Sequence, residues 1–132
     1  GIDYNRMCLI IAVLEKRLGL KFYQSDVYLN VIGGLRLDEP ASDLSVALAL
    51  ISSATDRIIP DDLIALGEVG LAGECRAVAN LEVRVKEAAR LGFTTAVVPF
   101  RNVEKRPLEI NGIRIVPVRG IYEALPLLRE KE

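Results

Sequence analysis

Ser42 and Lys86 are the two residues whose side chains could form the reactive pair of a serine–lysine hydrolase. Such an enzyme needs an alcohol as nucleophile and a lysine whose amine stays neutral, which burial achieves by disfavouring the charged form. Ser42 directly follows Pro40 and Ala41, and Lys86 lies in a segment with helical spacing. Because a nucleophile and its base must come within hydrogen-bonding reach, the elements that carry the two groups decide whether this chemistry is available.

The spacing of apolar residues predicts these elements. Helices are expected over residues 6–18, 43–53 and 81–91 and near 121–128. Strands are expected over residues 26–32, 63–66, 75–78, 94–98, 108–110 and 113–116. Asn111-Gly112 is a two-residue hairpin signal, and Pro126 should shorten the last helix. Since helices and strands are interspersed, with hairpins rather than regular crossovers, we predict the α+β class, with helices packed on small mixed or antiparallel sheets.

Composition limits the classes of function. At 132 residues, with 51% hydrophobic residues, the chain fits one domain spanning residues 1–132. The formal net charge of -1 argues against general attraction to nucleic acid, so any DNA contact must be local. No apolar run has the length of a membrane span and no signal-peptide pattern opens the chain, so we expect a cytoplasmic protein without a membrane partner. Cys8 and Cys75 each lie in an apolar stretch, which favours two buried free thiols over a disulfide.

Two motifs resemble the proteolytic domain of Lon. They are Asp-Glu-Pro-Ala-Ser-Asp at residues 38–43 and Gly-Glu-Val-Gly-Leu-Ala-Gly at residues 67–73, with the strand before the first and the helix after the second. In Lon a serine follows the proline and a lysine opens the later helix, whereas here these positions are Ala41 and Glu82. Together with the opening Gly-Ile-Asp-Tyr-Asn-Arg, this pattern resembles the C-terminal domain of the RadA (Sms) family of bacterial DNA repair proteins, over essentially the whole chain.

The resemblance implies a peptidase fold without its catalytic residues. Ala41 has no nucleophilic atom, and an ionised Glu82 would repel the oxyanion of an acyl-transfer intermediate. Ser42 and Lys86 are offset from the matched positions by about 100° around one helix entrance and by about 5–6 Å along the other helix, so they are a poor replacement pair. We therefore expect no catalytic residue, with Ser42 as the N-cap of helix 43–53 and Asp43 complementing the positive end of that helix.

The resemblance places the cofactors outside this chain. Family members carry an N-terminal zinc module with four cysteines and a RecA-like ATPase domain, yet this chain has neither a Cys-x-x-Cys pair nor a phosphate loop. We expect ATP, Mg and Zn in a preceding part of a longer DNA-dependent ATPase and no cofactor in this chain. The carboxylates of Asp38, Glu39 and Asp43 could hold a divalent cation, but their spacing matches no standard metal loop, so no metal site is predicted.

The resemblance also implies partners. Family members are expected to form homohexameric rings that move DNA branches during recombination, using ATP hydrolysed in another domain. In that setting this domain would support ring assembly and present a surface to DNA. Two alternatives remain: a peptidase or peptide binder that uses Ser42 and Lys86, and a protein-binding module that contacts a recombinase without touching DNA.

Two groups of basic residues are candidate DNA-binding sites. One lies on the outer face of helix 81–91 and one on the loop after strand 94–98; they are Arg84, Lys86 and Arg90, and Arg101, Lys105 and Arg106, respectively. For the helix, a solvated face interlaced with Glu82 and Glu87 is the alternative. In the loop, Phe100 accompanies the cations, which suits single-stranded DNA because phosphates meet cations while a base stacks. An ordinary solvated loop is the alternative there, and Arg36, Arg114 and Arg119 could contribute if the fold gathers them.

Overall fold

The computed structural model describes residues 4–20, 40–104 and 109–130. In chain order the elements are α1 (Tyr4–Leu18), η2 (Pro40–Ser42), α2 (Asp43–Thr55), β1 (Arg57–Ile58), β2 (Leu63–Ala65), β3 (Glu68–Val69), β4 (Cys75–Arg76), α3 (Leu81–Arg90), β5 (Thr95–Pro99), η3 (Phe100–Asn102), β6 (Glu109–Ile110), β7 (Ile113–Val118), α4 (Ile121–Ala124), η4 (Leu125–Leu127) and β8 (Arg129–Glu130). The mixed α+β class and the predicted helices are confirmed. The strand predicted over residues 26–32 lies outside the described residues.

The main sheet has the strand order β2-β5-β7-β6. β2, β5 and β7 are mutually parallel, and only β6 runs antiparallel to its neighbour. The expectation of hairpins throughout was therefore wrong for the centre of the sheet. The physical reason is that α3 lies between β2 and β5 in the chain and makes a crossover long enough for parallel pairing. β5 is buried along most of its length, as is typical of a parallel strand covered on both faces.

Within the described residues, three antiparallel strand pairs complete the arrangement. β6 and β7 form the predicted hairpin, in which Asn111 at φ 50 and Gly112 at φ 81 are both in the left-handed region that this tight turn requires. β3 pairs with β4, and β1 pairs with β8. The two latter pairs are short and lie outside the main sheet, so they fix loops rather than extend the sheet.

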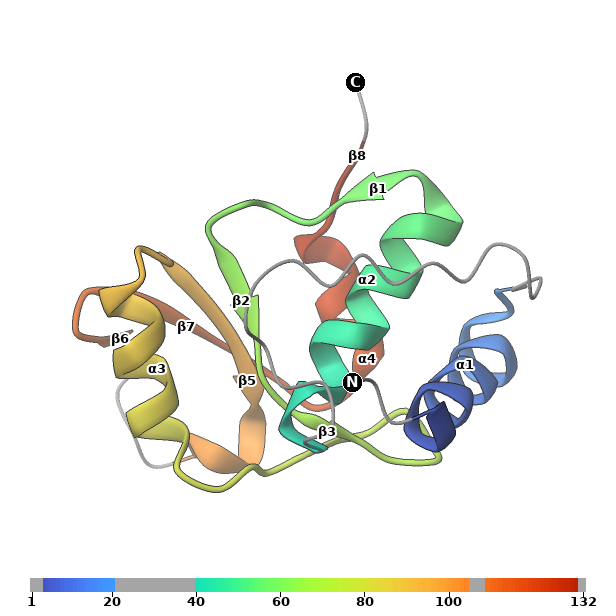
Figure 1. Cartoon of the computed structure of the whole chain (residues 1–132), viewed down its shortest axis with the longest axis horizontal. Coiled ribbons are helices and arrows are strands. Elements are labelled where there is room, and N and C mark those ends of the chain that lie inside the picture. Colours follow the sequence, from blue (N-terminus) through green and yellow to red (C-terminus); the bar gives the residue numbers. More distant parts are fainter. Residues whose placement is uncertain (1–3, 21–39, 105–108, 131–132) are drawn as a thin grey trace.

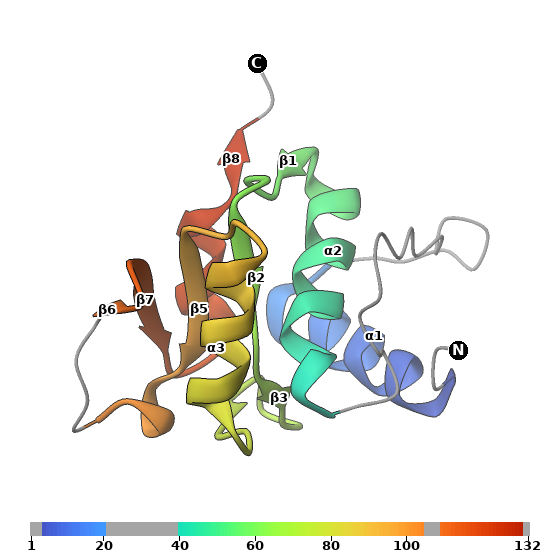
Figure 2. The ribbon, with the colours of Figure 1, turned by 60° about the vertical axis from the view of Figure 1, so that its left-hand side comes forward.

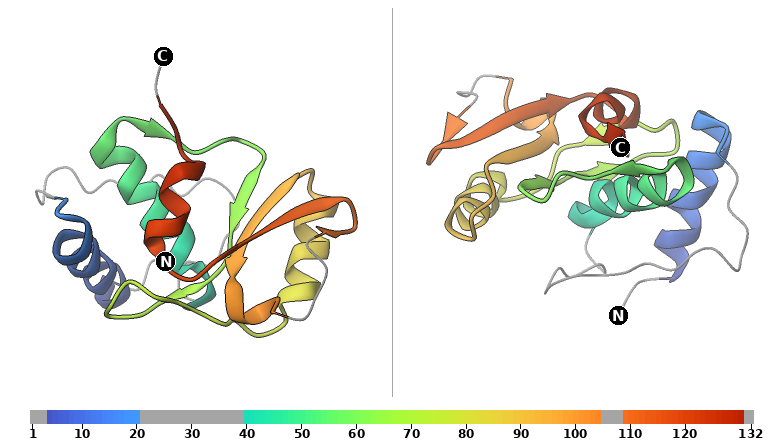
Figure 3. Two further views of the ribbon diagram at one scale, coloured as in Figure 1. Left: turned by 180° about the vertical axis from the view of Figure 1, so that it is seen from behind. Right: turned by 90° about the horizontal axis from the view of Figure 1, so that it is seen from above.

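α2 is the central helix of the molecule (Figures 1 and 3). Leu44, Leu48 and Ile51 are almost completely buried, and Asp43, Val46, Ala47 and Leu50 are buried too, which is typical of a helix enclosed on several sides. α1 packs on one side of α2 and α4 on another, and β2 lies between α2 and the rest of the sheet. These elements share one hydrophobic core, which we call the α2 core.

α3 covers the opposite face of the main sheet (Figure 2). Leu81, Val85 and Ala88 form its buried stripe and pack with Ala96 and Val98 of β5 in a second hydrophobic core, which we call the α3 core. Val97, between these two β5 residues, belongs to the α2 core instead, because successive strand residues point to opposite faces. The sheet thus separates the two cores.

The two cysteines differ in burial, so the expectation of two buried thiols holds for only one of them. Cys75 is buried and free, whereas Cys8 is free but exposed. The reason is that α1 buries only one stripe against α2, which includes Ile10, Val13 and Leu14. Within the described ranges, we find no helix with the length and apolar character that crossing a membrane requires.

Candidate functional site

The first candidate position, Ala41, is fixed in the interior at the entrance to α2. Gly67 donates its backbone N–H to the Ala41 carbonyl at 2.9 Å, and the Leu44 N–H donates to the Gly67 carbonyl at 3.0 Å. Ala41 is only 7% exposed. A methyl group added at Gly67 would lie 3.3 Å from Pro99 Cγ, so a larger residue there would require the Pro99 ring to shift.

Ser42 occupies the N-cap position but does not act as a cap. Its backbone, at φ -88 and ψ -5, continues the η2 turn, and its side chain makes no capping hydrogen bond. The expected cap was wrong because a capping side chain requires an extended backbone at this residue. Asp43 is 3% exposed and accepts a hydrogen bond from the Val69 N–H at 3.1 Å, so it links the first turn of α2 to β3.

The second candidate position, Glu82, lies in a different environment. Its carboxylate is 3.2 Å from Lys86 Nζ, and the two side chains are 49% and 50% exposed, respectively. Ser42 is therefore buried while Lys86 lies at the surface, the reverse of a dyad in which the lysine is the desolvated group.

The basic residues of α3 are interlaced with acidic ones. Arg90 pairs with Glu87 at 2.6 Å, and the hydrogen bond and charge of Glu87 raise the pKa of Arg90. Arg84 Nε donates to the Ala79 carbonyl at 3.1 Å. Exposed ion pairs of this kind contribute little free energy, so these cations remain available to bind an anionic ligand. They form a solvated face interlaced with Glu82 and Glu87, and their contact with DNA stays a prediction.

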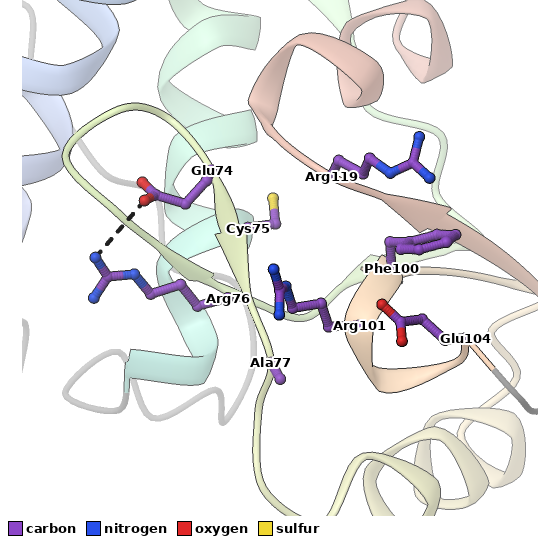
Figure 4. Close-up of a pocket in the computed structure, with 8 residues that line it drawn as sticks. All are labelled: Glu74, Cys75, Arg76, Ala77, Phe100, Arg101, Glu104 and Arg119. Atoms are coloured by element: carbon purple, nitrogen blue, oxygen red, sulfur yellow. Dashed lines mark ion pairs between the residues drawn. The ribbon is translucent and has the colours of Figure 1, made fainter.

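Arg101 lies beside a pocket at the carboxyl ends of the parallel strands (Figure 4). The pocket measures about 480 Å³. It is lined by Glu74, Cys75, Arg76, Ala77, Phe100, Arg101, Glu104 and Arg119. Lys105 and Arg106, the other two loop candidates, lie outside the described residues, as does Arg36. Carboxyl ends of parallel strands are where ligands bind in many α/β sheets, so the position is favourable for recognition.

The register of the sheet brings Phe100 and Arg119 together. Pro99 at the end of β5 pairs with Val118 at the end of β7, so the next residue of each strand lies at the same edge. The Arg119 guanidinium carbon is 4.2 Å from the centroid of the Phe100 ring. Such a cation–π contact at a surface contributes about 0.5–1 kcal/mol. Sequence reasoning named both residues, but only the parallel pairing of β5 and β7 joins them.

Two prolines end the strands at this edge. Pro99 closes β5, and Pro117 lies one residue before the end of β7, opposite Val98. Neither residue has a backbone N–H, yet the pairing of β5 with β7 continues to Pro99 and Val118, because alternate residues carry that ladder and both prolines face away from it. β5 then turns into η3, and β7 leads to α4 through Gly120.

β4 forms the opposite wall of the pocket. The sequence predicted a strand here but not its place beside the residues that follow β5 and β7. The Cys75 N–H donates to the Arg119 carbonyl at 2.8 Å, and the Ile121 N–H donates to the Gly73 carbonyl at 2.9 Å. These bonds place Arg76 beside the residues that follow β5 and β7. Pairing between segments more than 40 residues apart has no local signal, which is why Arg76 was missed.

Asn102 joins η3 to the loop between β4 and α3. Its side-chain Oδ1 accepts from the Val78 N–H at 2.9 Å, and its Nδ2 donates to the Val78 carbonyl, also at 2.9 Å. This pair of bonds imitates one step of a strand ladder and fixes the turn that carries Phe100 and Arg101.

The acidic side chain of Glu74 is turned away from the pocket (Figure 4). It accepts a hydrogen bond from the Ala72 N–H at 3.1 Å and lies 3.7 Å from the Arg76 guanidinium. Arg76 therefore contributes mainly its stem to the pocket, while Arg101 reaches toward β4. Among the cations that line the pocket, Arg101 and Arg119 are the two not turned toward Glu74.

Cys75 contributes a protonated thiol rather than a nucleophile. Burial, together with the charges of Glu123 and Glu74, raises its pKa to about 12. Because the thiolate is the reactive form, this cysteine is inert near neutral pH. The pocket thus offers three arginines, two carboxylates and an aromatic ring, groups that suit the binding of a ligand.

Comparison with known proteins gives two results. A family model described as "Subunit ChlI of Mg-chelatase" matches residues 8–102. The chain is 47% identical over 125 residues to the DNA repair protein RadA of Synechocystis sp., which covers 95% of this chain and 24% of that protein. The corresponding protein of Aquifex aeolicus is 46% identical over 128 residues, covering 97% and 28%, and that of Escherichia coli is 43% identical over 125 residues, covering 95% and 27%. The chain spans about a quarter of the length of these curated relatives.

Proposed function

The chain belongs to the family described as subunit ChlI of Mg-chelatase, and on that premise we propose that it is the non-catalytic, Lon-like domain of a RadA-type DNA repair protein. The observation that carries this proposal is identity of 43–47% over 95% or more of the chain to proteins named for DNA repair. Identity of this level over nearly the whole chain supports a role in DNA repair more directly than the description of the family model does.

The proposed loss of peptidase chemistry rests on the residues at the two motif positions. Ala41 supplies a buried methyl group and Glu82 a solvated carboxylate paired with Lys86. A peptidase of the serine–lysine type needs a nucleophile and a neutral amine within hydrogen-bonding reach of each other. The rival peptidase function predicts cleavage of unfolded casein or labelling by a reactive serine probe. We expect neither, and Ser42→Ala should change neither result.

We propose that the remaining roles are ring assembly and contact with DNA. In this proposal the ATPase activity, with its ATP, Mg and Zn, resides in other parts of a longer protein that forms a hexameric ring. The DNA contacts are assigned to the cations of α3 and of the pocket edge, with Lys105 and Arg106 adjoining them in sequence. The net charge of -1 means that binding depends on these local groups rather than on the whole surface.

Fluorescence anisotropy with a labelled single-stranded oligonucleotide tests the DNA role. Binding should weaken as salt rises, with a logarithmic slope of about -0.7 for each phosphate contacted. Lys105→Glu combined with Arg106→Glu should weaken binding, whereas Arg129→Glu, in β8 and outside both basic groups, should leave it unchanged. Absence of binding at low salt would favour the alternative of a module that contacts a recombinase protein. Light scattering of the chain, alone and joined to its ATPase part, tests ring assembly.

A further inference from the structure

The pocket between β4 and η3 combines stacking groups with a limited excess of positive charge. Its volume of about 480 Å³ lies within the range of small-ligand sites. Three arginines and two glutamates line it, which leaves a net charge of +1. This balance is suited to one phosphodiester, which carries a single negative charge, and is too small for a triphosphate. The charge therefore favours one link of a nucleic-acid backbone as the ligand.

Arg119 has the geometry of a stacking platform. Its guanidinium lies over the Phe100 ring at 4.2 Å, so the ring already restricts the orientation of the flat cation. The opposite face of a guanidinium held in this way can stack on a nucleobase, as arginine planes do in single-stranded nucleic-acid sites. The Arg119 side chain is exposed to solvent. Its backbone is held in place because the Cys75 N–H donates a hydrogen bond to the Arg119 carbonyl at 2.8 Å.

Arg101 is placed to contact the phosphate of the same nucleotide. It begins in η3, directly after Phe100, and its side chain extends across the pocket toward β4 (Figure 4). Asn102 fixes this turn through its two hydrogen bonds to Val78. Glu74, which would repel a phosphate, is instead directed to Arg76 and the Ala72 N–H. Where η3 and Arg119 meet, the pocket carries the two positive charges of Arg101 and Arg119 and the one negative charge of Glu104.

We infer that this pocket binds one nucleotide of a DNA single strand, with the base stacked on the Arg119 guanidinium and the phosphate contacted by Arg101. The inference rests on the proposed DNA role and deepens it by naming the strand type and the contact residues. A base in a duplex is stacked between its neighbours and cannot lie on the platform, whereas an unpaired base offers a free π-face.

The test compares strands that carry bases with strands that lack them. The 132-residue chain is titrated with labelled oligothymidine and with an abasic strand of the same length, at low salt. Arg119→Gln should weaken oligothymidine binding by about tenfold, because stacking on a side chain is worth about 1–3 kcal/mol per base. It should weaken abasic binding by only about two- to threefold, the effect of losing one cation. Phe100→Leu keeps apolar bulk but removes the ring, so it too should weaken binding of oligothymidine more than binding of the abasic strand.

Arg76→Gln is the matched control, because it removes the same charge from the same pocket but from a side chain turned toward Glu74. We expect equal, small losses on both strands for this variant. Urea unfolding of each variant verifies that the fold is retained. If wild-type chain binds neither strand, the proposed DNA role fails. If wild-type chain binds but Arg119→Gln and Arg76→Gln weaken both strands alike, or a blunt duplex binds as well as oligothymidine, only the nucleotide pocket is refuted.

Discussion

Replacement of Asn102 by alanine should destabilise the protein by about 2 kcal/mol. The side chain makes two hydrogen bonds to the backbone of Val78, each at 2.9 Å and partly buried. A hydrogen bond contributes about 1 kcal/mol net, and both backbone groups of Val78 would lose their partner. Asn102→Asp should destabilise to a similar degree, because the carboxylate can still accept from the Val78 N–H but would face the Val78 carbonyl without a donor.

Urea unfolding followed by far-UV circular dichroism is the suitable assay, because the chain contains no tryptophan. With an m value of about 1.5–2 kcal/mol/M, the midpoint should fall by about 1 M. Asn80→Gly is the control: Asn80 has φ 58 and no capping hydrogen bond, so glycine should fit within about 0.5 kcal/mol. A loss below about 0.5 kcal/mol for Asn102→Ala, or an equal loss for Asn80→Gly, would refute the assigned role of the paired hydrogen bonds.

Three further perturbations test other parts of the fold. Burial is the main reason that the pKa of Cys75 is raised to about 12 in the folded protein. Above the ordinary thiol pKa of 9.0, the unfolded chain therefore loses a proton that the folded protein keeps. Stability should therefore decline as pH rises through that window, and the urea midpoint of wild type should fall more than that of Cys75→Ala from about pH 8 to about pH 10. Gly73→Ala should cost about 2–3 kcal/mol, because φ is +83 and the added methyl would lie 3.2 Å from a core side chain, whereas Gly92→Ala, at φ +101 with open space, should cost about 1 kcal/mol in the same assay. Asp43→Ala should cost about 2 kcal/mol by leaving a buried β3 amide unpaired, and Asp43→Asn, which retains an acceptor, should recover much of that loss in thermal melts.

The local elements could be predicted from the sequence because their signals are short in range. The spacing of Leu44, Leu48 and Ile51 gives α2, and Asn111-Gly112 gives the β6–β7 hairpin. The role of Ser42 could not be predicted in this way. The backbone around it is fixed by hydrogen bonds with Gly67, a contact between distant segments, and this contact overrides the local preference of serine for an extended cap.

The candidate site shows the same division. Phe100 and Arg101 stand out in the sequence as an aromatic residue beside a cation, and they line the pocket. The partner of Phe100 depends on the parallel register of β5 and β7, and Arg76 depends on hydrogen bonds from the β3–β4 hairpin to the segment after β7. Such pairings join segments that share no local pattern, so they can be read only from the folded chain.

The parallel register of β5 and β7 has a consequence for how the site can change. Phe100 and Arg119 directly follow the last residue pair of the two strands, Pro99 and Val118, so the ladder holds their backbones at one edge whatever side chains they carry. Substitution of Phe100, Arg101 or Arg119 could therefore retune ligand preference while the strands stay paired. This edge is a natural place for engineering new specificity onto an unchanged scaffold.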